Sequence, residues 1–493
     1  MSHATPTPGA AAAGATDPAD LGVLEAAREL RARRLSSAEL TDAVLARIAA
    51  RNGGEPTFDG APDAVNAWAR VYPDEARALA RAADERRARE GDEAPLLCGI
   101  PLGLKDLYAV AGLPVTASSR MLEGNVASED AVVWARLKAA GMVLVGHTHT
   151  HEFAFGGTTD QVGNPWDLAR SAGGSSGGSA AALAARMVPA ATGTDTAGSV
   201  RIPAAMSGIS AIKPTHGRVP IAGIVPLAVT LDHAGPMARS LADCSALLGA
   251  MADGAAESSP LMPPPAPLGP MPLAPSPGPR PLAGRTIAVL GDPPRVALDP
   301  DVAAGLEDAA RACERLGARV VRAERPREAS LREWALVASV DFWSYHEQFD
   351  GRAGEYRPFL RTITAAVRDA GPAAAYARAQ QERVVLTGIW ERWMAAAGID
   401  LLLEATIPGP APERTVGYTP ELPNPDPHIL LTFAWNATGF PVAALPAGLG
   451  ARSGLPVGVS LIGPRGAEAD VVQAGIDLQE HALAPPVVPY ATP

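Results

Sequence analysis

The chain has 493 residues, a formal net charge of −11, 47% hydrophobic residues and 19% charged residues. Such a composition indicates a globular protein with a large core, and the acidic balance argues against nucleic acid or an anionic membrane as a partner. The three cysteines, Cys98, Cys244 and Cys313, lie far apart. They form neither a disulfide framework nor a zinc-ligand pattern, which suits a reducing compartment.

The first 18 residues are rich in proline, alanine and threonine, and they lack the basic start and apolar core of a secretory signal. We therefore expect a flexible tail over 1–18 and one large domain over 19–493. No uninterrupted apolar stretch reaches the about 18 residues of a membrane-spanning helix, so no such helix is expected. With the cysteine usage, this favours a cytoplasmic protein.

Hydrophobic periodicity predicts helices and strands that alternate along the chain. We expect helices over 21–51, 74–89, 130–140, 180–187, 240–251, 301–317, 330–395 and 466–483. We expect strands over 65–72, 96–110, 142–146, 188–192, 282–290 and 318–321, and again within 400–462. Ser36 or Ser37 is a predicted N-cap for the first helix, and Ser179 for the helix over 180–187. The Pro-rich stretch at about 255–281 predicts a surface linker, and the alternation of strands with helices predicts the α/β class.

Two Gly/Ser-rich turns, 173–179 (GGSSGGS) and 193–199 (GTDTAGS), dominate the middle of the chain. Glycines let such turns aim backbone N–H groups at a ligand. Gly/Ser-rich composition is more usual in flexible linkers, but an Ala/Leu/Met segment joins these two turns directly. The Lys-Ser/Thr end of a phosphate loop and the GxGxxG pattern are both missing, so nucleotide binding is weakly supported.

The segment 173–205 resembles the signature segment of the amidase signature family of serine hydrolases. The stretch 99–107 (GIPLGLKDL) is similar to the family's lysine strand. Lys105 precedes Ser175 by 70 residues and Ser175 precedes Ser199 by 24, which is similar to the family's Lys, cis-Ser, Ser pattern. Further matches lie at 151–154, 164–166, 213–219 and 231–236. The resemblance implies a mixed β-sheet surrounded by helices, in a single large domain.

The resemblance also implies roles for individual residues. Ser199 would be the nucleophile, Ser175 the proton relay and Lys105 the base, which acts unprotonated because burial among apolar neighbours lowers a lysine pKa. The oxyanion would be held by the backbone amides of Thr196, Ala197, Gly198 and Ser199. Ala197 departs from the glycine that relatives commonly carry, and it would be strained if the position needs a positive φ.

Other residues are expected to support the site. Arg201 is placed to pair with Asp195 and so hold the second turn in shape. Phe153, Phe155 and Gly174 are expected to bind substrate in the resemblance. Five tryptophans of the divergent later part are expected to complete an apolar wall: Trp334, Trp343, Trp390, Trp393 and Trp435. Ser176 and Ser179 are expected to make hydrogen bonds and cap a helix, not to act as nucleophiles.

The expected activity is hydrolysis of a carbon–nitrogen bond in a small, apolar amide, with esters and carbamates as further substrates and a homodimer as the expected assembly. No metal or organic cofactor is required. One alternative is the glutaminase subunit of a tRNA-dependent amidotransferase, and another is a non-catalytic binding protein. A third is a metal-dependent amidohydrolase, suggested by His147, His149 and His151, which would share one face of a strand.

Overall fold

The computed structural model describes residues 17–252, 267–291, 296–368, 372–414 and 426–489. Across these residues, eleven strands form one sheet in the order β1-β3-β2-β6-β8-β7-β12-β13-β11-β9-β10. These strands are β1 (Trp68–Val71), β2 (Pro101–Lys105), β3 (Val143–Thr148), β6 (Ala190–Asp195), β7 (Ser210–Lys213), β8 (His233–Ala238), β9 (Thr286–Leu290), β10 (Arg319–Ala323), β11 (Leu401–Ala405), β12 (Val442–Leu449) and β13 (Pro456–Ile462). A separate short pair is formed by β4 (Gly163–Asn164) and β5 (Asp167–Ser171).

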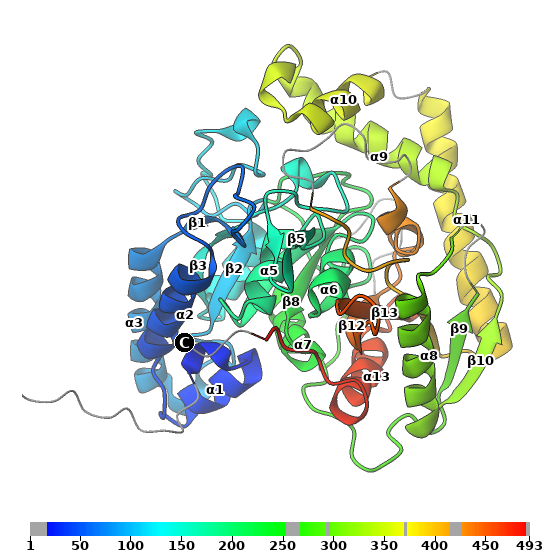
Figure 1. Cartoon of the computed structure of the whole chain (residues 1–493), viewed down its shortest axis with the longest axis horizontal. Coiled ribbons are helices and arrows are strands. Elements are labelled where there is room, and N and C mark those ends of the chain that lie inside the picture. Colours follow the sequence, from blue (N-terminus) through cyan, green and yellow to red (C-terminus); the bar gives the residue numbers. More distant parts are fainter. Residues whose placement is uncertain (1–16, 253–266, 292–295, 369–371, 415–425, 490–493) are drawn as a thin grey trace, which may run out of the picture.

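Helices surround the sheet, with α1 to α3 at one end and α9 to α11 at the other (Figure 1). They are α1 (Val23–Arg31), α2 (Ser37–Arg51), α3 (Pro73–Glu90), α4 (Val132–Ala139), α5 (Gly177–Ala184), α6 (Arg201–Ser207), α7 (Leu241–Met251), α8 (Pro300–Arg315), α9 (Leu331–His346), α10 (Pro358–Val367), α11 (Ala373–Ala397), α12 (Phe433–Ala437) and α13 (Glu468–His481). Parallel and antiparallel pairs both occur, because β2 runs parallel to β3 and β6 while β8 runs antiparallel to β6. The predicted mixed α/β fold is confirmed. Among the described helices, none has the length and apolar character needed to cross a lipid bilayer.

The N-terminal helices follow local sequence signals. The predicted helix over 21–51 is two helices, and Ser36 caps the second: its Oγ accepts from the Glu39 amide, and the Glu39 carboxylate accepts from the Ser36 amide. Within the stretch predicted as a tail, Asp17 forms an ion pair with Arg47, which also pairs with Asp20. Residues 1–16 lie outside the described part of the chain.

The capping role predicted for Ser179 is wrong. Helix α5 begins at Gly177, so Ser179 lies inside its first turn. Its Oγ donates to the Thr192 carbonyl (2.8 Å) and shares a hydrogen bond with Thr148 Oγ1 (2.7 Å). Ser179 therefore links α5 to β6 and β3 through hydrogen bonds.

One sheet unites the two halves of the chain. Strand β12, from the later half, pairs antiparallel with β7, and β13 pairs with β11. The Pro-rich stretch between the halves is described from residue 267 onward, and 267–281 contains neither helix nor strand. The predicted linker therefore connects parts of a single sheet, and its residues 255–266 lie outside the described part.

The carboxyl ends of three strands that run parallel lie at one edge of the sheet. Strands β2, β3 and β6 end at Lys105, Thr148 and Asp195. Ligands and catalytic groups gather at the carboxyl ends of parallel strands. The turn 196–199 follows β6 directly and leads into α6, so it lies at the same edge as Lys105.

Candidate active site

Lys105 is fully buried at the end of β2. Its Nζ lies 2.8 Å from Ser175 Oγ and 2.8 Å from Thr194 Oγ1. Burial lowers the pKa of Lys105 from 10.5 to about 7, although the negative charges of Asp195 and Asp232 oppose this shift. Near neutral pH, much of this lysine is therefore the free amine that a base must be. Thr194 was not identified from the sequence. The only signal for it was its position on a buried strand, on which alternate side chains face the same side.

Ser175 stands just before α5, and the Gly174–Ser175 peptide bond is cis. Its carbonyl accepts from the His151 amide (3.0 Å) and from Thr159 Oγ1 (3.2 Å). A Cβ on residue 174 would overlap the carbonyl oxygen of Thr158, which is backbone and cannot easily move. Glycine is therefore required at this position for close packing beside Ser175.

Ser199 lies between β6 and α6 and is 7% exposed. Its carbonyl accepts from the Ser176 amide (3.2 Å), so the two Gly/Ser turns meet, as their resemblance to the signature implies. Within the described residues, Ser199 Oγ has no hydrogen-bond partner. The structure thus joins Lys105 to Ser175 directly and brings Ser199 alongside them without a Ser175–Ser199 hydroxyl bond.

The ion pair predicted between Asp195 and Arg201 is present, and both side chains are fully buried. The shortest separation of the two groups is 2.9 Å. Burial alone would raise the pKa of Asp195, but the Arg201 guanidinium outweighs it and lowers the pKa to about 2. Asp195 also accepts from the amides of Gly198 (2.7 Å) and Val200 (3.2 Å), so one carboxylate holds the whole turn.

Two residues of the later half complete this network, and neither was identified from the sequence. Asn436 of α12 donates to the carbonyl and carboxylate of Asp195 (both 2.8 Å) and accepts from Arg201 (2.6 Å). Thr432 donates through its Oγ1 to the Ala197 carbonyl and accepts from Arg201 through its own carbonyl (3.1 Å). The only sequence signal was Asn436, an amide side chain in the largely apolar segment 431–440.

The backbone of the turn corrects two expectations. Gly198 has φ 134°, whereas Ala197 is not among the described residues with positive φ, so the strain considered for alanine does not arise. The Gly198 amide already donates to Asp195 and is not free for an oxyanion. Among the described residues, the amides of Ala197 and Ser199 have no acceptor.

The aromatic residues are placed differently from the expectation. Phe153 is fully buried among rings that include Tyr345, His346, Phe349 and Tyr356, so it has no free face for a substrate. Phe155 is half-buried against Phe342 and Phe359.

Of the five tryptophans, Trp390 and Trp435 are core residues that pack on each other at 5.1 Å. Their place in the pocket wall was wrongly predicted. Half-buried Trp334 does border the site, because its Nε1 donates to the Thr196 carbonyl (3.4 Å).

The three histidines do not converge. Strand β3 ends at Thr148, and each imidazole has its own partners: His147 bonds Tyr72 and Tyr108, and His149 bonds Ser118 and Thr57. His151 bonds the carbonyl of Glu152. No group of three or more candidate metal ligands occurs in the part of the chain that the structure describes.

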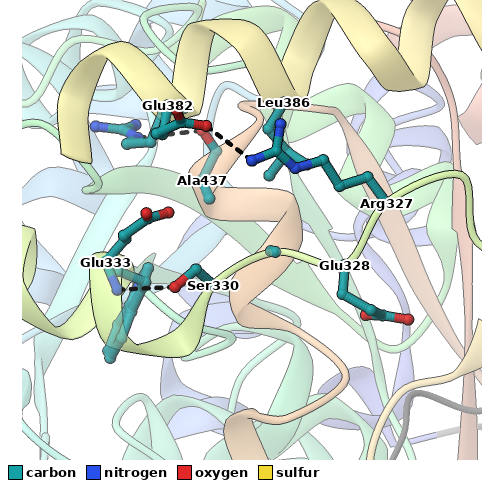
Figure 2. Close-up of a pocket in the computed structure, with 10 residues that line it drawn as sticks. Arg327, Glu328, Ser330, Glu333, Glu382, Leu386 and Ala437 are labelled. Atoms are coloured by element: carbon teal, nitrogen blue, oxygen red, sulfur yellow. Dashed lines mark hydrogen bonds and ion pairs between the residues drawn. The ribbon is translucent and has the colours of Figure 1, made fainter. Parts of the chain in front are cut away.

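Two cavities lie outside the site, since Lys105, Ser175 and Ser199 line neither of them. A cavity of about 30 Å³ lies between the start of α9, the helix α11 and the end of α12 (Figure 2). It is lined by Trp334 and by charged residues that include the ion-paired Arg327 and Glu382. A groove of about 850 Å³ lies at the other end of β6, beside Arg239, which follows the strand paired with Ala190.

Comparison with known proteins identifies the family of the chain. The family model described as Amidase matches residues 57–472. The chain is similar to a glutamyl-tRNA(Gln) amidotransferase subunit of Cupriavidus taiwanensis, with 36% identity over 92% of this chain and 94% of that protein. Its structure is similar to that of 6-aminohexanoate cyclic dimer hydrolase complexed with substrate (TM-score 0.79, 28% identity, 95% and 98% coverage). It is also similar to the native peptide amidase from Stenotrophomonas maltophilia (TM-score 0.77, 27% identity, 96% and 99% coverage). The chain belongs to the amidase family, whose members hydrolyse carbon–nitrogen amide bonds.

Proposed function

We propose that this chain hydrolyses small, apolar amides through an acyl intermediate on Ser199. The observation that carries the proposal is the buried Lys105 Nζ, 2.8 Å from Ser175 Oγ, beside a turn that presents Ser199. A serine hydroxyl needs a base to become a nucleophile, and a buried lysine with a pKa of about 7 is suited to that task.

The proposed reaction begins with two proton transfers. Ser199 Oγ gives its proton to Ser175 Oγ, which gives its own to neutral Lys105, and Ser199 Oγ bonds to the carbonyl carbon. This step requires Ser199 Oγ to come within hydrogen-bonding distance of Ser175 Oγ. The carbonyl π electrons move to oxygen, and that oxyanion accepts hydrogen bonds from backbone amides of the turn. The free amides of Ala197 and Ser199 are the donors we favour, with Thr196 as a third.

Collapse of the tetrahedral intermediate breaks the carbon–nitrogen bond. Ser175 Oγ passes a proton to the leaving nitrogen and regains one from protonated Lys105. Water then attacks the acyl ester with the same base and relay, which releases the carboxylic acid and restores Ser199. No cofactor enters this sequence.

The preference for apolar substrates is supported by two rings beside the turn. Trp334 contacts Thr196 through its Nε1, and Phe433 follows Thr432, which contacts Ala197. The two ring centroids are 6.0 Å apart. Small-molecule pockets are mostly apolar with a few placed polar groups, and these rings suit an aryl or alkyl acyl group.

The experiment is a substrate panel combined with covalent labelling. We expect purified protein to hydrolyse anilides and alkyl amides, and a fluorophosphonate to modify Ser199. We expect Ser199→Ala to lose nearly all turnover and all labelling, whereas Ser344→Ala, on the exterior helix α9, keeps both. A label found by mass spectrometry on Ser175 or Ser176 would overturn the assignment of the nucleophile.

The second candidate function is the glutaminase subunit of a tRNA-dependent amidotransferase. It is supported by the 36% identity to a protein that is named as part of such an enzyme. In that case the purified chain would need partner chains and would prefer glutamine. A kcat/KM ratio below one for an anilide over glutamine would favour this candidate and leave the serine mechanism intact.

A further inference from the structure

The turn between β6 and α6 is held from outside by two side chains that come from much later in the sequence. Trp334 Nε1, on the first turn of α9, donates to the Thr196 carbonyl at 3.4 Å. Thr432 Oγ1, just before α12, donates to the Ala197 carbonyl. Both donors therefore act on backbone oxygens of the turn that presents Ser199, and neither belongs to the motifs of residues 99–240.

A planar trans peptide links the direction of each carbonyl to that of the next amide. Within such a unit, C=O and N–H point in opposite directions. The Ala197–Gly198 unit is fixed on both sides, since its oxygen accepts from Thr432 and its N–H donates to Asp195 (2.7 Å). The Thr196–Ala197 unit is fixed on one side only, by Trp334.

The free side of that second unit is the Ala197 amide. Because the Thr196 carbonyl points to Trp334, the Ala197 N–H points away from it, and among the described residues this N–H has no acceptor. If the Thr196–Ala197 peptide unit rotated by half a turn, the Thr196 carbonyl oxygen would point where the Ala197 N–H points now. The oxyanion would then face a partial negative charge instead of a hydrogen-bond donor. An oxyanion hole depends on donors that are oriented before the reaction begins.

We propose that Trp334 is a positioning residue that orients the Ala197 amide toward the oxyanion. This inference rests on the proposed amide hydrolysis by Ser199. Trp334 is suited to the task because its ring is itself held, packed against Phe433 at 6.0 Å and lining the small cavity between α9 and α11. The divergent region after residue 330 thereby completes a catalytic element of the signature region.

The test is Trp334→Phe, which keeps an aromatic ring against Phe433 and removes the indole N–H. We expect kcat for an anilide to fall by about 10- to 100-fold, below the about 10²- to 10³-fold loss of a deleted oxyanion donor, with KM within about twofold. The affinity for a boronic acid analogue, whose tetrahedral adduct uses the hole, falls by a similar factor. The affinity for a substrate-like amide that is not hydrolysed stays unchanged. Trp166→Phe, which removes an indole N–H that donates to the Ser207 carbonyl (2.9 Å) at the far end of α6, is the matched control and keeps wild-type values.

A second variant keeps the test independent of how α9 tolerates substitution. Thr432→Val removes the other side-chain donor, but Asp195 still holds the Gly198 amide, so the loss in kcat should be smaller than for Trp334→Phe. An unchanged kcat and boronate affinity in Trp334→Phe would overturn the inference, as would a larger loss in Thr432→Val. Wild-type protein without turnover and without labelling at Ser199 would instead overturn the hydrolase proposal, and this inference with it.

Discussion

At the scale of single residues, the environment of Lys105 determines what chemistry is open to it. A lysine in water is protonated at neutral pH, but here the ammonium form loses its hydration, and among the described residues two hydroxyl groups are its hydrogen-bond partners. The negative charges of Asp195 and Asp232 favour the ammonium form but do not restore the ordinary pKa. The same side chain on a surface strand would be an ordinary exposed charge.

The pH dependence of the rate should follow this group. Because the pKa of Lys105 is about 7 and the neutral form is the proposed base, kcat/KM should rise as pH increases through about 7 and then level off. Initial rates for an anilide between pH 5.5 and 9 measure the profile. A rate that falls over this range would contradict a lysine base.

Replacing the base gives a second prediction. We expect Lys105→Met, which is apolar and of similar length, to lower kcat by about 10²-fold or more and to abolish the inflection near pH 7. Lys138→Met serves as the control, since Lys138 is 53% exposed in a surface pair with Asp130 and should leave both rate and profile unchanged. Normal turnover of Lys105→Met at neutral pH would contradict the assignment of Lys105 as the base.

At the scale of elements, structure that depends on neighbouring residues could be predicted from the sequence, whereas contacts between distant residues could not. The capping box at Ser36 depends on residues three positions apart, so the sequence indicated where α2 begins. The joining of the two serine turns followed from the motif resemblance. Asn436 and Thr432 reach the turn only because β12 pairs with β7, a register that periodicity cannot supply. Trp390 and Trp435 were wrongly assigned to the wall of the pocket, because composition does not show which face of α11 or α12 packs against the core.

The buried pair between β6 and α6 should matter more for stability than a surface pair. Arg201→Met leaves Asp195 charged, buried and without its cation, and we expect a loss of about 3–5 kcal/mol in the free energy of unfolding. The control is Arg311→Met, which removes an exposed pair with Asp308 and should cost about 1 kcal/mol or less. Urea denaturation followed by circular dichroism compares the two. Equal losses would contradict the structural importance of the Asp195 network.

At the scale of the whole molecule, the continuous sheet makes the two halves one structural unit. The pairing of β7 with β12 joins residues that precede the Pro-rich stretch to residues near the end of the chain. The described core clusters cross the same boundary, since Ile212, Leu241 and Leu445 belong to one of them. A division into independent domains at the linker is therefore not favoured.

Cooperative unfolding is the corresponding prediction. We expect a single transition in denaturant, with the same midpoint for far-ultraviolet circular dichroism and for tryptophan fluorescence. The two halves should unfold together because strands of one half pair with strands of the other. The eight tryptophans are distributed over both halves, so fluorescence reports on each. Two separate midpoints would show that the halves unfold independently.

The separation of 235 positions between Arg201 and Asn436 has a consequence for the protein during its synthesis. The ribosome makes Ser199 long before it makes Trp334, Thr432 and Asn436, which hold the turn around that serine. At about 5–20 residues per second, this interval lasts roughly 12–47 seconds. Through that time the nascent chain carries the proposed nucleophile without the residues that hold its turn, so hydrolytic competence should arise only after translation of the later half. Stalled nascent chains that end before residue 430 should accordingly show no reaction with a fluorophosphonate, whereas released full-length chains should react.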